Sequence, residues 1–135
     1  MADCVFCGIV AGEVPAHTVH DDDLTIAFMD IGQVNPGHVI VAVKPHRETF
    51  VDLDVEEVSA AFRTAHRVAR AVEAAFGPEG LTILQANRPA GFQTVPHFHL
   101  HVLPRHTGDG VELTWPAKHP PSQELAALAA RIRAA

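Results

Sequence analysis

The sequence predicts a fold that combines about five β-strands with one long helix and a C-terminal helix. Alternating apolar and polar residues mark the strands, and apolar residues three and four positions apart mark a helix over 54–76. The length of 135 residues suits one domain with its own buried core. We therefore expect a single domain over residues 1–135.

Composition and charge exclude two classes of partner. The formal net charge of −6 argues against a polynucleotide, because binding to its phosphates depends on a basic surface. No apolar run approaches the ~18 residues that span a membrane, and Met1-Ala2-Asp3-Cys4 lacks the basic start of a secretory signal. We expect a cytoplasmic protein, whose charge is compatible with a small anionic ligand.

The chain begins with the motif Cys4-Val5-Phe6-Cys7. In a reducing compartment such a pair is a metal half-site or a redox centre more often than a disulfide. A redox pair usually follows a strand, and no strand is expected before Cys4, which favours zinc. Two thiolates make half of a tetrahedral site. The ten histidines are too many for spacing alone to select the other two ligands.

Two short strands are expected between His17 and Asp30, joined by the turn Asp21-Asp22-Asp23. The three carboxylates are best explained as a solvated hairpin turn, since they lie too close together in the sequence to surround an ion. Asp30 follows the second strand. A carboxylate there either caps a turn or binds a pair of sugar hydroxyls, and the residues alone favour the cap.

The centre of the sheet and the long helix come next. Asn35-Pro36-Gly37 is a turn that leads into residues 38–43, a strand apolar at nearly every position and therefore central. His38 at its start is expected to be a hydrogen-bonded structural residue. Asp54 and Glu57 begin the helix, and Gly77-Pro78 ends it. Its expected apolar face consists of Val58, Phe62, Ala65, Ala69, Val72 and Phe76, with the arginines on the solvated side.

The second half of the chain contains a buried strand over 81–86 and an irregular segment over 88–96. Gln93 and Thr94 close that segment with an amide and a hydroxyl group. Near the C-terminus, a loop that contains Trp115 leads to a helix that begins at residues 122–125. This helix has a narrow apolar edge formed by Leu125, Leu128 and Ile132.

The most informative stretch is residues 97–103, His-Phe-His-Leu-His-Val-Leu. In a strand this alternation sends His97, His99 and His101 to one face and the apolar residues to the other. A surface strand that is merely rich in histidine does not need this alternation with large apolar residues. The apolar face of the strand is therefore expected to pack in the core, and the histidine face to form a reactive or binding site.

Residues 97–103 resemble the signature of the histidine-triad (HIT) family of nucleotide hydrolases and transferases, without a substitution. The resemblance covers most of the chain, through Cys4-x-x-Cys7, Phe28-Met29-Asp30-Ile31, Pro36-Gly37-His38, Pro45-His46, Asn87, Gln93-Thr94-Val95 and Pro104-Arg105. It implies an α+β fold in which an antiparallel sheet of about five strands carries one long helix. It also implies a two-fold homodimer that shares a continuous sheet.

The resemblance also implies an activity and a set of site residues. His99, the middle histidine, would attack the phosphorus of a purine nucleoside monophosphate conjugate. Asp30 would hold the ribose hydroxyls, and Ile31 would line the base pocket. The residues implied to surround the phosphate are Asn87, Gln93, Thr94 and His101.

The zinc-bearing bacterial members of the family imply one structural zinc ion per chain, held by Cys4, Cys7, His46 and His97. The chain differs from the better-studied branch at Phe92, where those enzymes have glycine. The segment between Asn87 and His97 is also one residue shorter. Both differences fall in the loop implied to surround the phosphate.

The chemistry of imidazole is consistent with this activity. A neutral ring with a pKa of ~6.5 is a nucleophile near pH 7 and can form a phosphoryl-histidine that water hydrolyses. Its other nitrogen must donate to an acceptor, for which we expect a backbone carbonyl, with His38 as a neighbour. A protonated His101 would donate to the phosphate. The scheme needs no magnesium. If His97 binds zinc, Thr94 or water must protonate the leaving group.

Two main functions fit these residues. The first is an enzyme that cleaves phosphoramidates or dinucleoside polyphosphates through a nucleotidyl-histidine intermediate. The second is a nucleotide-binding module with vestigial hydrolysis and a structural zinc. The intact His99 favours the enzyme. A third function, that of a zinc-dependent structural or partner-binding protein, depends on Cys4 and Cys7 alone.

Overall fold

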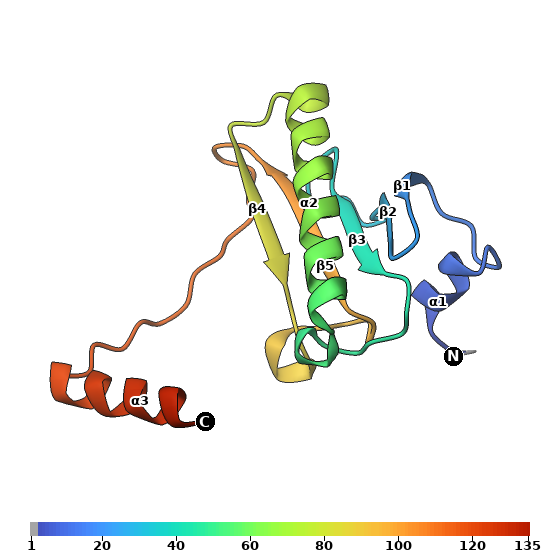
Figure 1. Ribbon diagram of the computed structural model, residues 1–135. Helices are drawn as coiled ribbons and strands as arrows, with labels where there is room; N and C mark the ends of the chain where they lie inside the picture. Colours follow the sequence, from blue (N-terminus) through green and yellow to red (C-terminus); the bar gives the residue numbers. More distant parts are fainter. Residues whose placement is uncertain (1–2) are drawn as a thin grey trace.

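The computed structural model describes residues 3–135, and a five-stranded antiparallel sheet lies at its centre (Figure 1). The strands are β1 (Thr18–Asp21), β2 (Thr25–Met29), β3 (Val39–Val43), β4 (Gly80–Gln85) and β5 (His99–Arg105). Their order in the sheet is β1-β2-β3-β5-β4, and each neighbouring pair is antiparallel. Every residue of β3 is buried, as its apolar sequence predicts. The predicted α+β class is confirmed.

Helix α2 (Val55–Phe76) covers one face of this sheet (Figure 1). The predicted capping box is present, because Asp54 accepts the Glu57 N–H and Glu57 accepts the Asp54 N–H. Gly77 ends the helix with φ +56°, a conformation that glycine adopts without steric cost. The core between helix and sheet contains Ala27, Val39, Val41, Val43, Ala61, Ala65, Val68, Val72, Phe98, Leu100 and Val102.

The buried side of α2 differs from the apolar face predicted for it. The prediction was wrong for Phe62 and Phe76, which are 45% and 49% exposed. Ala60 and Ala61 are buried instead, because small side chains allow the helix to lie close to the sheet. The aromatic rings lie at the margins of the contact. Phe76 lies so close to Gly37 that a Cβ there would be 2.8 Å from the ring.

Strand β5 divides its side chains between the two faces of the sheet. Leu100 and Val102 join the core beneath α2. His99 points to the other face, where its ring lies edge-on to Phe6. His97, just before the strand, contacts the same phenyl ring. The predicted alternation is confirmed, although the strand begins at His99 rather than at His97.

A short helix, α1 (Val5–Val10), lies on the face opposite α2 and is not expected from the sequence. Cys4 is its N-cap, and the sulfur accepts the Cys7 N–H at 3.4 Å. Phe6 holds α1 on the sheet through Phe28, with 5.3 Å between the ring centroids. A helix of six residues is too short to show helical periodicity in the sequence.

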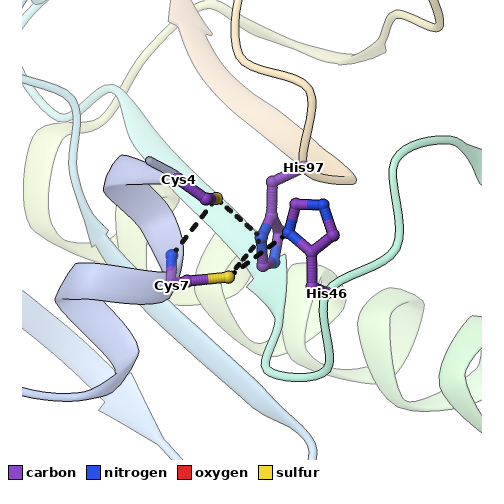
Figure 2. Close-up of side chains that lie close together, drawn as sticks. All are labelled: Cys4, Cys7, His46 and His97. Carbon is purple, nitrogen blue, oxygen red and sulfur yellow. Dashed lines mark hydrogen bonds between the residues drawn. The ribbon is translucent and has the colours of Figure 1, made fainter. Parts of the chain in front are cut away.

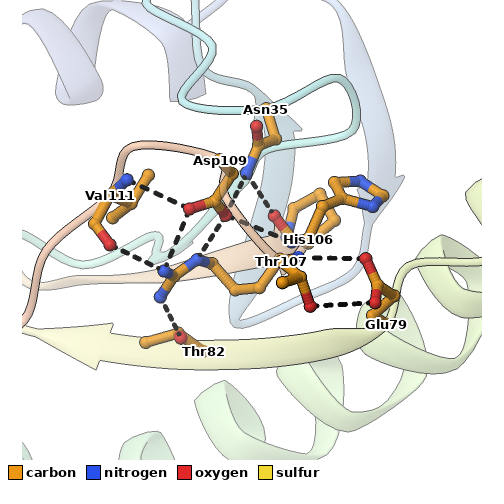
Figure 3. A network of polar contacts seen from close by, with 9 residues as sticks. Asn35, Glu79, Thr82, His106, Thr107, Asp109 and Val111 are labelled. Carbon is orange, nitrogen blue, oxygen red and sulfur yellow. Dashed lines mark hydrogen bonds and ion pairs between the residues drawn. The ribbon is translucent and has the colours of Figure 1, made fainter.

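A polar network fixes the chain where it leaves β5 (Figure 3). The Asp109 carboxylate accepts hydrogen bonds from Arg105 Nε at 2.8 Å and from Asn35 Nδ2 at 2.9 Å. The bond from the Arg105 guanidinium is the main reason that the pKa of Asp109 lies well below its usual range. The network therefore sets the direction in which the following segment leaves the sheet.

The C-terminal helix predicted from the sequence is present as α3 (Ser122–Ala134). An extended segment carries it away from the sheet, and none of its residues is buried (Figure 1). Leu125, Leu128 and Ile132 are 52%, 42% and 77% exposed. Among residues 3–135, no helix combines the length and apolar character needed to cross a membrane.

Candidate active site and metal centre

One hydrogen bond and one aromatic contact orient His99. Its Nδ1 lies 2.7 Å from the carbonyl oxygen of His97. Because a carbonyl can only accept, Nδ1 carries the proton and Nε2 keeps its lone pair. The ring of Phe6 lies edge-on at 4.9 Å between centroids, with an interplanar angle of 86°. The nucleophilic nitrogen of His99 is therefore Nε2.

Burial keeps the His99 ring neutral. Burial lowers the pKa of His99, the hydrogen bond to the His97 carbonyl opposes this effect, and the charge of His101 adds to it. The net result is a pKa below the ordinary value of 6.5. At neutral pH the ring therefore retains the lone pair that a nucleophile needs.

His101 lies beside His99 and contacts a further histidine, His38. The rings of His99 and His101 are 5.0 Å apart between centroids. His101 Nδ1 is 2.8 Å from His38 Nε2. Burial lowers the pKa of both His38 and His101, so both rings are neutral at pH 7. The sequence considers donation by a protonated His101, and a neutral His101 can also donate if its proton is on Nε2.

The sequence predicts that His38 is a hydrogen-bonded structural residue and a neighbour of His99, but it does not predict the contact with His101. The pairing of β3 with β5 places Ile40 opposite His101, and His38 precedes β3 by one residue. No residue pattern reveals this register. The predicted hydrogen bonding of His38 is nevertheless confirmed, since its Nδ1 accepts the Val34 N–H at 3.2 Å.

A cavity of about 470 Å³ opens beside His99 and His101. Its polar lining also includes Asp30 and Thr94. Its apolar lining includes Val5, Phe6, Ile9, Val14, Phe28, Ile31, Ile40 and Val95. This volume lies within the range of pockets that bind small molecules. Ile31 is 98% exposed and therefore stands at the mouth of the cavity.

Asp30 is the turn cap that the residues favour, and it also lines the cavity. Its Oδ1 accepts the Gly32 N–H at 2.8 Å, which is the expected turn cap. Its Oδ2 lies 3.3 Å from His38 Nε2, and the residue also lines the cavity. The cap therefore orients the carboxylate without using both of its oxygens, and a ligand hydroxyl can reach it from the cavity.

Asn87 and Gln93 are not among the residues that line the cavity, and the backbone and neighbouring side chains take up their amide groups instead. Asn87 Oδ1 accepts the Phe50 N–H at 2.7 Å. Gln93 Oε1 accepts the Arg88 N–H at 2.7 Å, and its Nε2 donates to the Glu48 carbonyl at 2.6 Å. Gln93 therefore holds the loop over 88–93, while Asn87 connects the end of β4 to Phe50.

This loop contains both of the described non-glycine residues with positive φ. Arg88 has φ +63° and Phe92 has φ +69°. Such a conformation favours glycine and costs a residue with a side chain about 1 kcal/mol or more. The Phe92 side chain is 88% exposed, so no packing of the ring offsets this strain. The hydrogen bonds of Gln93 hold the loop in place instead.

Figure 2 shows that Cys4, Cys7, His46 and His97 form one cluster beside α1. Their ligand atoms all lie within 4.8 Å of one another. Cys4 Sγ is 3.3 Å from His97 Nδ1, and Cys7 Sγ is 3.3 Å from His46 Nδ1 and 3.6 Å from His97 Nδ1. A tetrahedral zinc ion with Zn–S of about 2.3 Å and Zn–N of about 2.0 Å needs sulfur and nitrogen about 3.5 Å apart. The cluster therefore fits zinc.

Hydrogen bonding and ionisation at the cluster suit a cation as well. His97 Nε2 lies 2.6 Å from the Val43 carbonyl, so the proton is on Nε2 and the Nδ1 lone pair faces the sulfurs. Burial raises the pKa of the Cys7 thiol, and the adjacent Cys4 raises it further. A bound cation would stabilise both thiolates and remove this penalty.

The sequence pattern of the HIT domain family matches residues 11–108. A Bacillus subtilis protein named Protein hit is 38% identical over 114 residues, which are 84% of this chain and 79% of that protein. An adenosine 5'-monophosphoramidase of Schizosaccharomyces pombe is 31% identical over 130 residues, which are 96% of this chain and 95% of the relative.

Solved structures agree with the sequence relatives. A HIT family protein of Bacillus anthracis matches with a TM-score of 0.93 at 34% identity, over 97% of this chain and 95% of the other. A zinc-bound histidine triad family protein of Mycobacterium smegmatis matches with a TM-score of 0.77 at 34% identity, over 99% of both chains. With the three alternating histidines of residues 97–101, these likenesses show that the chain belongs to the HIT family.

Proposed function

We propose that the protein is a nucleotide-binding hydrolase or nucleotidyl transferase that cleaves purine nucleoside monophosphate conjugates through a nucleotide bound covalently to His99. The orientation of His99 is the observation that carries this proposal. The His97 carbonyl holds its Nδ1–H, which leaves the Nε2 lone pair for attack on phosphorus. The adjoining cavity is large enough for a nucleoside.

The reaction would proceed in two displacements at phosphorus. In the first, His99 Nε2 forms a bond to phosphorus, and the leaving group departs with the electron pair of the bond that breaks. A proton from the Thr94 hydroxyl or from water neutralises the leaving group, since the His97 ring faces the sulfurs. In the second, water forms the new bond to phosphorus, and the electron pair of the N–P bond returns to His99. The proton that this water loses restores the Thr94 hydroxyl or passes to solvent, so that the two steps balance.

The lining of the cavity supports a division into base, ribose and phosphate sites. The apolar residues with Ile31 would cover the purine base, and Asp30 would accept hydrogen bonds from the ribose hydroxyls. Thr94 and the Nε2–H of His101 would donate to the phosphate oxygens. Asn87 and Gln93 would act by shaping the loop that surrounds those oxygens.

Two kinds of substrate have the bond that this reaction breaks, phosphoramidates and dinucleoside polyphosphates. The relative named as an adenosine 5'-monophosphoramidase, which spans 96% of this chain, supports a nucleoside phosphoramidate. Its name fits a leaving group that departs as an amine. We therefore choose an adenosine phosphoramidate as the first substrate to test.

The cluster of Cys4, Cys7, His46 and His97 would hold one zinc ion per chain. Four protein ligands complete a tetrahedral site and leave no position for water, which makes the ion structural. The zinc-bound relative from Mycobacterium smegmatis supports this assignment. A reducing compartment such as the cytoplasm would keep both cysteines as thiols.

We also propose that two copies form a homodimer through β4. This strand lies at the edge of the sheet, and its residues Ile83 and Leu84 are 44% and 39% exposed. An uncovered edge with apolar side chains favours pairing with another strand. Helix α3 exposes a further apolar edge beyond β5, which a second copy would cover.

The test is a rapid-quench reaction with an adenosine phosphoramidate that carries labelled phosphorus. We expect a burst of label on the protein that acid releases, because a phosphorus–imidazole bond is acid-labile. The burst should disappear in His99→Ala and persist in His66→Ala, which removes an exposed histidine of α2. Nucleotide binding without covalent label or turnover would instead favour a nucleotide-binding module.

A further inference from the structure

His38 is a buried histidine that connects two residues of the cavity without lining it. Its side chain is 3% exposed. Its Nε2 lies 2.8 Å from His101 Nδ1 and 3.3 Å from Asp30 Oδ2. His101 and Asp30 both line the cavity, and they are the proposed phosphate donor and the proposed ribose ligand. His38 is therefore placed to transmit a change from one to the other.

The hydrogen bond from Val34 selects the tautomer of His38. A backbone N–H can only donate, so the Nδ1 that accepts it at 3.2 Å has no proton. Burial lowers the pKa of His38 and keeps the ring neutral at pH 7. Its single proton is therefore on Nε2. This Nε2–H has two acceptors within reach, His101 Nδ1 and Asp30 Oδ2.

The two acceptors correspond to two states of His101. When His38 donates to His101, Nδ1 of His101 is an acceptor, and its own proton is on Nε2. That Nε2–H can donate to a phosphate oxygen. When His38 turns its Nε2–H from His101 to Asp30, the 2.8 Å contact between the two rings opens, because two N–H groups cannot face each other at that distance. The proton of His101 can then move to Nδ1, and the Nε2 lone pair repels the phosphate. Both acceptors lie within hydrogen-bond reach of His38 Nε2, at 2.8 Å and 3.3 Å. The shorter distance favours His101, the negative charge of Asp30 favours the carboxylate, and the ligand therefore decides between the two states.

We propose that Asp30 and His38 couple recognition of the ribose to the tautomer of His101. Ribose hydroxyls that donate to Asp30 occupy its oxygen lone pairs, so that His38 directs its N–H to His101. His101 then presents Nε2–H to the phosphate. A nucleotide without these hydroxyls leaves Asp30 free to compete for the His38 proton. The inference rests on the proposed function. It makes His38 a positioning residue, through which the presence of ribose hydroxyls changes the rate of the chemical step.

The same hydrogen bonds argue against a metal ion at this second cluster. The ligand atoms of Asp30, His38 and His101 lie within 4.8 Å of one another. To bind a metal, His38 Nε2 would need its lone pair, and the proton would then move to Nδ1, against the Val34 N–H. His97 is the opposite case, because its bond to the Val43 carbonyl leaves Nδ1 available.

The tautomer can be measured directly from the ¹⁵N chemical shifts of labelled histidine in the zinc-loaded protein. Adenosine, which has ribose hydroxyls and no reactive phosphate, should shift His101 toward the Nε2–H form. 2',3'-Dideoxyadenosine at equal occupancy should not. Bound adenosine that leaves His101 protonated on Nδ1 would overturn the inference. Failure of adenosine and adenosine monophosphate to bind would instead contradict the proposed function.

The protein without ligand provides a test that does not depend on nucleotide binding. In His38→Leu, His101 Nδ1 loses its donor, so the population of the Nδ1–H form should rise. In His38→Gln, a side-chain N–H is retained near Nδ1, and the Nε2–H form should persist. Identical His101 spectra in the wild type and His38→Leu would overturn the inference. His66→Ala is the control for loss of a histidine elsewhere.

The kinetic test compares an adenosine phosphoramidate with its 2',3'-dideoxy analogue. In the wild type, kcat should fall about tenfold for the analogue, as expected for the loss of one hydrogen bond in the transition state. In His38→Leu both substrates should share the lower kcat, while KM still favours ribose because Asp30 is present. His38→Gln should keep the ribose kcat within about threefold of the wild type. A tenfold ratio of kcat that persists in His38→Leu would overturn the inference.

Discussion

The carbonyl oxygen of His97 accepts the Nδ1–H of His99 at 2.7 Å, while the His97 ring directs its own Nδ1 toward Cys4 Sγ at 3.3 Å. The same residue therefore meets the candidate metal site with its side chain and the candidate nucleophile with its backbone. A zinc ion that holds the ring also holds the carbonyl that orients His99. Order at the metal site should thus influence catalysis without contact between metal and substrate.

Replacement of His99 by alanine should abolish turnover and leave nucleotide binding nearly unchanged. The imidazole acts on the barrier more than on the bound ground state, so we expect kcat to fall roughly a thousandfold or more. Calorimetric titration with adenosine monophosphate should show a dissociation constant within about threefold of the wild type. Activity above about a hundredth of the wild type would remove His99 from the nucleophile role.

Replacement of Asp30 by alanine should weaken ribonucleotides and spare their dideoxy counterparts. Only the ribose, and not the dideoxy sugar, has hydroxyls that donate hydrogen bonds to the carboxylate. A hydrogen bond to a charged group contributes about 1.5–3 kcal/mol. We expect the dissociation constant of adenosine monophosphate to rise by about tenfold or more. Equal weakening of both nucleotides would leave Asp30 with its turn cap to Gly32 alone.

Removal of zinc should destabilise the protein and slow catalysis only in part. Elemental analysis should find one zinc ion per chain in protein purified without added metal or chelator. A chelator should lower the melting temperature and increase hydrogen exchange in α1, which the ion connects to His46 and His97. Cys4→Ser should reproduce both effects. A zinc content well below one equivalent, with Cys4 and Cys7 freely alkylated, would contradict a zinc site. His97 would then be available to protonate the leaving group.

Stability should fall as the pH is lowered below 6.5. Burial lowers the pKa of His38 and of His101 below 6.5, their ordinary value in the unfolded chain. Below that pH the unfolded state binds protons that the folded state does not, so the free energy of unfolding decreases until the folded pKa values are reached. Urea unfolding between about pH 7.5 and pH 5 measures this slope.

The Cys4→Ser background separates this histidine effect from acid release of zinc. In that background, His38→Gln should flatten the dependence on pH, because one of the buried titrating groups is gone. His66→Ala, at an exposed position, should leave the slope unchanged. A flat profile in the parent Cys4→Ser protein would contradict the neutral, buried state of these rings.

Polar substitution of the exposed edge of α3 should weaken the proposed dimer. Serine in place of Leu125, Leu128 and Ile132 removes the apolar side chains that a second copy would cover. Sedimentation equilibrium should then give a dissociation constant higher by about tenfold or more. An equal dissociation constant would exclude α3 from the interface, and a monomeric wild type would contradict the dimer itself.

Periodicity predicted the central strands and α2 because their burial is complete or one-sided. Helix α3 was predicted from its narrow apolar edge, although none of its residues is buried. Strand β3 is apolar throughout because it is buried throughout. The prediction failed where packing depends on the partner rather than on the segment. Phe62 and Phe76 fit a helical apolar face, yet close approach of α2 to the sheet requires alanines there and moves the rings to the margin.

The candidate site was predictable where residues stand next to one another in the sequence. The alternation of His97, His99 and His101 specifies which side chains share a face. The contact of His38 with His101 was not predictable, because it depends on the register between β3 and β5. The four proposed zinc ligands came from likeness to a family, since three separate segments supply them and their spacing alone does not select them.

Strand β5 places apolar side chains in the core on one face and histidines at the candidate site on the other, and this alternation limits how the chain can evolve. An insertion or deletion of one residue within 97–103 would exchange the two faces and place imidazoles beneath α2. Such a change would eliminate folding and reactivity together, so selection has no intermediate to act on. Changes of length are tolerable on either side of the strand, in the loop over 88–96 and in the extended segment over 111–121 that leads to α3. Differences in length between relatives are therefore expected in those two segments, while the length of β5 stays constant.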